Sequence, residues 1–97
     1  MHKKLLELSN LNMNKLILLL DTILKENNQE NKVKLIKEFQ NFVWHNANIE
    51  NISFSNTIDD LAYDLEFYVE DPQYYGEKKM KKEVETVLKK LIDHSSK

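Results

Sequence analysis

The sequence predicts an all-α fold: a small antiparallel bundle of four helices, or of five segments if the first one breaks. The chain has one Gly and one Pro in 97 residues, too few turn formers for an all-β protein of this length. Four segments carry apolar residues at steps of three and four. By length this is one domain, so residues 1–97 are expected to share a single core.

The first segment is Lys3–Lys25. Its apolar residues fit one helical face, and the dense run Leu16–Leu20 predicts a helix buried on more than one side. The stretch Ser9–Asn14 is a poor helix former, because Ser and Asn side chains compete for backbone hydrogen bonds. We expect either a kink there or a short first helix that breaks near Ser9.

The second helix is expected at Glu30–Trp44, where apolar residues again repeat at helical steps. Its stripe consists of Val33, Ile36, Phe39 and Val43, widened by Leu35 and Phe42. The Asn-rich segment His45–Ser55 reads as an irregular connector. Its apolar residues are expected to pack back on the core, with a short β-like stretch at Ile52–Phe54 as an alternative.

The third helix is expected to begin near Thr57, which would act as its N-cap, and to end before Pro72. Its core stripe is Ile58, Leu61, Ala62, Leu65 and Val69. Asp71–Gly76 is predicted to be a loop. A fourth helix over Glu77–His94 has the clearest amphipathic pattern in the chain, carried by Met80, Val84, Val87, Leu88 and Leu91.

The charges are segregated along the chain, although the net charge is only −2. Residues 38–77 hold nine acidic residues and no Lys or Arg, whereas residues 1–37 and 78–97 hold seven Lys each. Such asymmetry bears on partners rather than on fold. The middle segment would repel a nucleic acid and attract a cationic protein.

The sequence lacks the motifs of most kinds of catalytic and metal site. The chain has no Cys, its single Gly excludes a Gly-rich phosphate loop, and its three His are far apart in sequence. A carboxylate cluster for Mg²⁺ is conceivable, but the calcium-loop pattern is absent and a solvated acidic face explains the same residues. That cluster would consist of Asp59, Asp60, Asp64 and Glu66. We therefore expect no enzyme activity, no cofactor, no metal and no small-molecule ligand.

The lysines of the fourth helix raise the alternative of RNA or DNA binding. They are interleaved with Glu77, Glu83 and Glu85, and Arg is absent from the chain. Nucleic-acid sites rely on concentrated positive charge and stacking aromatics. A solvated face is therefore the preferred interpretation, and no direct contact with nucleic acid is expected.

The outer face of the third helix is the strongest candidate site. At 100° per residue, Tyr63 and Phe67 form a pair opposite the core stripe, with acidic residues around them. Exposed aromatics ringed by charge are typical of binding hot spots. The alternative is that Phe67 packs under the segment carrying Tyr74 and Tyr75. The predicted partner-binding residues are Asp60, Tyr63, Asp64, Glu66, Phe67, Glu70 and Asp71.

The third and fourth helices also carry a pattern found in a known family. It runs Asp60-Leu61-x-x-x-Leu65-Glu66-x-Tyr68, then Glu70-Asp71-Pro72, then Met80-Lys81-Lys82-Glu83-Val84-x-x-x-Leu88-Lys89-Lys90-Leu91. This third of the chain resembles the colicin D immunity protein group and the immunity proteins of contact-dependent growth inhibition systems. The segment Gln73–Gly76 is shorter than the family's usual connector, and the N-terminal half shows no such match.

The resemblance implies a helical bacterial immunity protein that covers the basic active site of a cognate toxin, often an RNase acting on tRNA. Asp60 and Glu66 fall on the matching positions, whereas the other candidate residues come from the helical face alone. The alternative is an interaction module or homodimer without a toxin. No secretory signal is recognisable and no apolar run approaches the roughly 20 residues of a membrane span, so a cytoplasmic protein without membrane contact is expected.

Overall fold

The computed structural model describes the backbone of residues 2–45 and 55–95 and the side chains of residues 12–45 and 55–94. The described part is helical, which confirms the predicted all-α class. Its elements are α1 His2–Lys25, α2 Gln29–His45, α3 Ser55–Glu70, α4 Pro72–Tyr75 and α5 Glu77–Ser95. The two end residues of the predicted connector His45–Ser55 belong instead to α2 and α3, and the rest of it, with its β-like alternative, lies outside the described residues.

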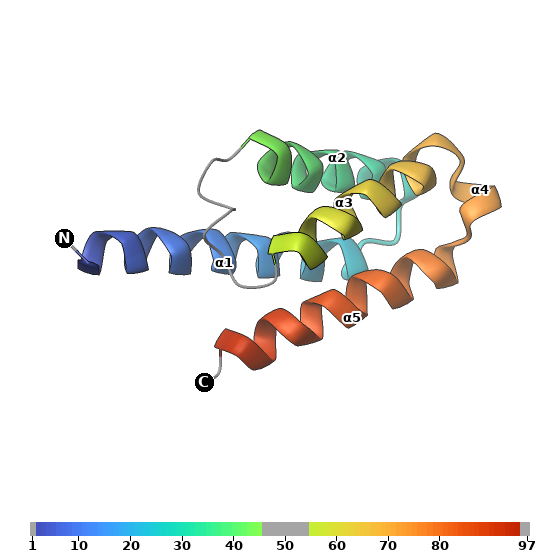
Figure 1. The fold of residues 1–97 in the computed structure, drawn as a ribbon. Coiled ribbons are helices and arrows are strands. Elements are labelled where there is room, and N and C mark those ends of the chain that lie inside the picture. The colour runs from blue at the N-terminus through green and yellow to red at the C-terminus, as the bar shows by residue number, and fades with distance from the viewer. Residues whose placement is uncertain (1, 46–54, 96–97) are drawn as a thin grey trace.

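The four long helices form a ring in which successive long helices run in opposite directions (Figure 1). α1 packs against α2 and α5, and α3 packs against the same two helices from the other side. α3 is therefore diagonal to α1. Its inner side faces the core and its outer side is left to solvent, and this placement decides which of its residues a partner can reach.

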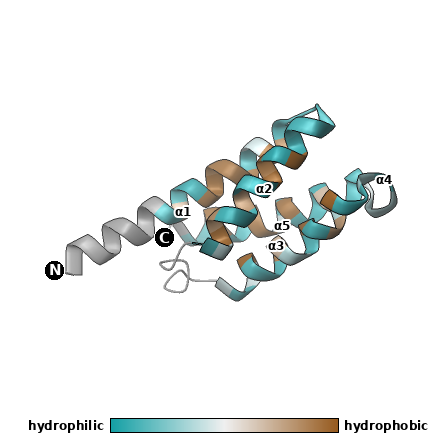
Figure 2. Cartoon of the chain, turned by 90° about the horizontal axis from the view of Figure 1, so that it is seen from above, coloured by the Kyte–Doolittle hydropathy of each residue, from teal (hydrophilic) through white to brown (hydrophobic). Residues whose placement is uncertain are grey.

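The core is made of the inner stripes of these helices, which alternate with hydrophilic stripes in Figure 2. All five residues predicted for the last helix, Met80, Val84, Val87, Leu88 and Leu91, are buried. On α3 the predicted stripe is buried except at Val69, which is half-buried. The stripe also includes Tyr68, which was not predicted and is 1% exposed.

α1 is continuous from His2 to Lys25, so the predicted break near Ser9 is wrong. Ser and Asn cost only tenths of a kcal/mol each in a helix, and tertiary packing readily overrides this. Met13, which lies within the Ser/Asn stretch, is buried in the core. Within the apolar run Leu16, Leu19 and Leu20 are buried, but Leu18 is 65% exposed.

Two predicted boundaries around α3 are also wrong. The helix begins at Ser55, so Thr57 lies inside it rather than at its N-cap. The predicted loop contains α4, a single turn that Asp71 caps by accepting a hydrogen bond from the Tyr74 backbone N–H at 3.2 Å. Pro suits the first position of a helix because its missing N–H is not needed there. Gly76 then ends the turn with φ of 92°, a conformation that favours glycine.

A buried lysine ties two diagonal helices together at one end of the bundle. Lys32, in the first turns of α2, is 1% exposed and its ammonium binds the carboxylate of Glu77, the first residue of α5. Glu77 also interacts with the Tyr68 side chain. The hydrogen bond from Lys32 is the main reason why the pKa of Glu77 lies below its ordinary value of 4.5. Burial, followed by the charge of Glu77, raises the pKa of Tyr68 above 10.0.

Candidate protein-binding face

Tyr63 and Phe67 lie on the outer side of α3, as the sequence predicts. Each is 61% exposed, although large aromatic side chains usually contribute to cores. The alternative in which Phe67 packs beneath the following segment is therefore wrong. Exposing two aromatic rings on adjacent turns forgoes the free energy of burying them, so the surface needs an explanation beyond folding.

The sequence did not point to Trp44, which extends this surface onto α2. Trp44 is 40% exposed, and the centroid of its ring lies 5.6 Å from that of Tyr63 at an interplanar angle of 49°. The tilted arrangement is one that aromatic pairs prefer. The exposed aromatic face thus consists of Trp44, Tyr63 and Phe67 and crosses the junction of α2 and α3.

Replacing Tyr63 with Ala is expected to change the fluorescence of Trp44, because Trp44 is the only Trp and Tyr63 is its ring partner. The emission should shift to longer wavelength as water reaches the indole. The free energy of unfolding should change by less than about 1 kcal/mol, since Tyr63 is exposed. Emission spectra and urea unfolding measure both. An unchanged spectrum would show that the two rings are not in contact in solution.

Glu66, one of the predicted binding residues, is engaged inside the bundle. It is half-buried, and its Oε2 accepts a hydrogen bond of 2.9 Å from the Gln40 amide of α2. Nε2 of Gln40, which donates this hydrogen bond, also donates one of 3.0 Å to the Ala62 carbonyl. The Gln40 side chain is buried, with 3% exposure. Because a buried amide needs its partners, Glu66 helps to join α2 to α3.

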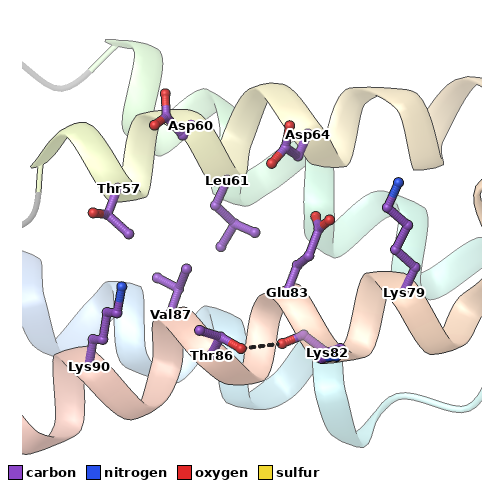
Figure 3. Close-up of a pocket in the computed structure, with 10 residues that line it drawn as sticks. All are labelled: Thr57, Asp60, Leu61, Asp64, Lys79, Lys82, Glu83, Thr86, Val87 and Lys90. Carbon is purple, nitrogen blue, oxygen red and sulfur yellow. Dashed lines mark hydrogen bonds between the residues drawn. The ribbon is translucent and has the colours of Figure 1, made fainter.

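Asp60 and Asp64 border a groove between α3 and α5, which has a volume of about 490 Å³. Leu61 and Val87 point toward one another from the two helices (Figure 3). The charged residues of this groove balance, with three acids and three lysines: Asp60, Asp64, Glu83, Lys79, Lys82 and Lys90. The lysines of α5 therefore offset much of the acidic field that the sequence predicted along α3.

Acidic residues outnumber lysines at the end of α3 that leads into α4. A second hollow of about 410 Å³ is bordered there by α3, α4 and α5. It has four carboxylates against one lysine: Asp64, Glu70, Asp71, Glu83 and Lys79. Its aromatic walls are Phe67, Tyr74 and Tyr75, of which Tyr74 is 90% exposed. We call this hollow the α4 pocket.

The structure thus divides the predicted site. Asp64, Phe67, Glu70 and Asp71 meet at the α4 pocket. Tyr63 lies on the aromatic face, Asp60 borders the balanced groove, and Glu66 is bound to Gln40. The residues that were missed are Trp44, Tyr74, Tyr75 and Lys79. The doublet of tyrosines after Pro72 is the signal that could have indicated a second aromatic surface.

Comparisons with family models, curated proteins and solved structures gave no match for this chain. Within residues 12–45 and 55–94, no three His, Asp or Glu side chains are grouped so as to hold a metal ion. Across the part of the chain that the structure describes, no helix has the length and apolar character needed to cross a membrane. What the chain does is therefore inferred from the aromatic face and the α4 pocket themselves.

Proposed function

We propose that this chain is a protein-binding module that covers a cationic surface of its partner, and that it serves as an immunity protein against a bacterial toxin. The observation that carries the proposal is the exposure of Tyr63 and Phe67, 61% each, beside a pocket with a surplus of acids. Aromatic anchors rimmed by charge supply contact area and orientation together. The sequence pattern shared with the colicin D immunity protein group is consistent with it.

The physical mechanism has two stages. The acids at the α4 end attract a basic partner and raise the rate of encounter. Tyr63 and Phe67 are then buried against the partner, and the loss of hydrated aromatic surface stabilises the complex. A nuclease suits this scheme, because its active site is basic where phosphates bind, and carboxylates can occupy the same positions. The chain then acts by covering the nuclease active site in the cytoplasm, without contacting nucleic acid itself.

The charge contribution is tested by the double variant Asp64→Lys/Glu70→Lys. Association with the toxin domain is expected to slow by at least about tenfold at low salt, and its salt dependence should disappear. Stopped-flow mixing at several ionic strengths measures this. The matched control is Glu38→Lys/Glu85→Lys, which makes the same change in net charge at exposed positions outside the pocket. Equal effects of the two double variants would contradict steering by the α4 end.

A second candidate is a homodimer formed through the same aromatic face, since Trp44, Tyr63 and Phe67 present apolar surface on one side of the bundle. Sedimentation velocity at two concentrations separates the two proposals. A dimer that weakens on dilution and is lost in Phe67→Glu supports self-association. A monomer at both concentrations leaves the face free for another protein.

A further inference from the structure

The α4 pocket combines two features that recognise cations. Phe67, Tyr74 and Tyr75 supply aromatic rings, whose faces attract positive charge. Glu70 and Asp71 lie at the same rim and supply carboxylates. A cluster of acids alone would bind hydrated ions weakly and without selectivity. Aromatic walls favour instead a large, weakly hydrated cation such as a guanidinium group.

The chain already places one cation in this pocket. The Lys79 ammonium lies 4.6 Å from the centroid of the Tyr75 ring. Tyr75 is held for this role, because its hydroxyl donates a hydrogen bond to Glu83 of α5 and its ring packs edge-on against Tyr68, with centroids 6.3 Å apart. Lys79 itself is exposed, so its ammonium can leave the ring for water at small cost.

We infer that the α4 pocket receives one arginine side chain of the partner protein, and that this side chain displaces the Lys79 ammonium from the Tyr75 ring. The inference deepens the proposed function and rests on it for the identity of the partner. An arginine is favoured over a lysine because its planar group stacks on aromatic rings and binds a carboxylate through two parallel hydrogen bonds. Glu70, which is exposed at the rim, is the carboxylate that receives it.

The pocket is tested without the partner, using N-acetyl-arginine amide as the probe and N-acetyl-citrulline amide as its uncharged counterpart. Titration is followed by backbone amide NMR at constant ionic strength. The arginine probe should cause saturable shifts confined to α4 and the facing turns of α3 and α5, with a dissociation constant on the order of 10 mM. Citrulline should bind at least about fivefold more weakly. Equal shifts with both probes, or no saturation with arginine, would overturn the inference.

Lys79→Gln tests the displacement step. Removing the resident cation should tighten binding of the arginine probe about threefold more than Lys78→Gln does. Lys78 is the matched control, because it is an exposed neighbour on the same helix but does not border the pocket. Glu70→Gln should weaken binding about threefold. Equal tightening by the two lysine variants would show that only net charge matters and that Lys79 does not occupy the site.

The outcomes also separate this inference from the proposed function. If the chain binds the arginine probe specifically but binds no toxin domain, the inference that the α4 pocket binds arginine is supported and the immunity function is rejected. Toxin binding that is unaffected by Lys79→Gln and Glu70→Gln, together with no selectivity for arginine over citrulline, would preserve the role and reject the pocket.

Discussion

Glu77→Gln is expected to lower the free energy of unfolding by about 2 kcal/mol, because it leaves the Lys32 ammonium buried without its carboxylate. The cost falls below that of a fully buried pair, since the Glu77 side chain is 49% exposed. Lys32→Met should cost less, within about 1 kcal/mol. Lys32→Met removes the buried charge, and the Glu77 carboxylate can then be hydrated. Urea unfolding of the two variants measures the difference.

The same pair makes a prediction about pH. The pKa of Glu77 lies below its ordinary value of 4.5 in the folded chain, so its ionisation stabilises the fold above that value. This stabilisation is lost as the pH falls through the folded-state pKa. The difference in unfolding free energy between wild type and Glu77→Gln should therefore be full at pH 7 and shrink below pH 4.5. A difference that stays constant between pH 7 and pH 3 would show that the ion pair does not contribute.

Phe67→Glu is expected to weaken partner binding by about a hundredfold or more, equivalent to about 2.7 kcal/mol, as for a central hot-spot residue. Stability should change little, because Phe67 is 61% exposed. The control is Leu18→Glu, which introduces the same charge at a 65% exposed apolar position on α1, diagonal to α3. Titration calorimetry should show normal affinity for the control. Similar losses for both variants would remove Phe67 from the interface.

The predictable part of this fold is the part governed by hydrophobic periodicity. Every core position of α5 follows from its spacing, since a long helix has one face to bury and little to compete with it. The predicted break in α1 failed because weak local preferences yield to packing around Met13 and Leu16. The prediction of a loop at Asp71–Gly76 was wrong because the sequence signal for α4 is weak. One turn carries no periodicity, so only its Pro and its capping Asp could indicate it.

The sequence predicted those features of the candidate site that depend on α3 alone. The orientation of Tyr63 and Phe67 depends only on the stripe of α3. The contacts that the acidic residues make depend on the neighbouring helices, whose positions do not follow from the sequence of α3 alone. Gln40 of α2 hydrogen-bonds Glu66, and three lysines of α5 border the same groove as Asp60. The buried Lys32 did leave a signal, because it falls in register with Ile36, Phe39 and Val43 on the inner face of α2.

The most direct test of the immunity proposal is inhibition of a toxin domain that is captured by co-purification with this chain. The purified domain is assayed for tRNA cleavage with increasing amounts of the wild-type chain, Phe67→Glu and Leu18→Glu. We expect wild type and Leu18→Glu to abolish cleavage near one equivalent, and Phe67→Glu to require at least about a hundredfold more. Full cleavage in the presence of excess wild-type chain, or equal inhibition by Phe67→Glu, would contradict the proposal that the exposed aromatic face neutralises a toxin.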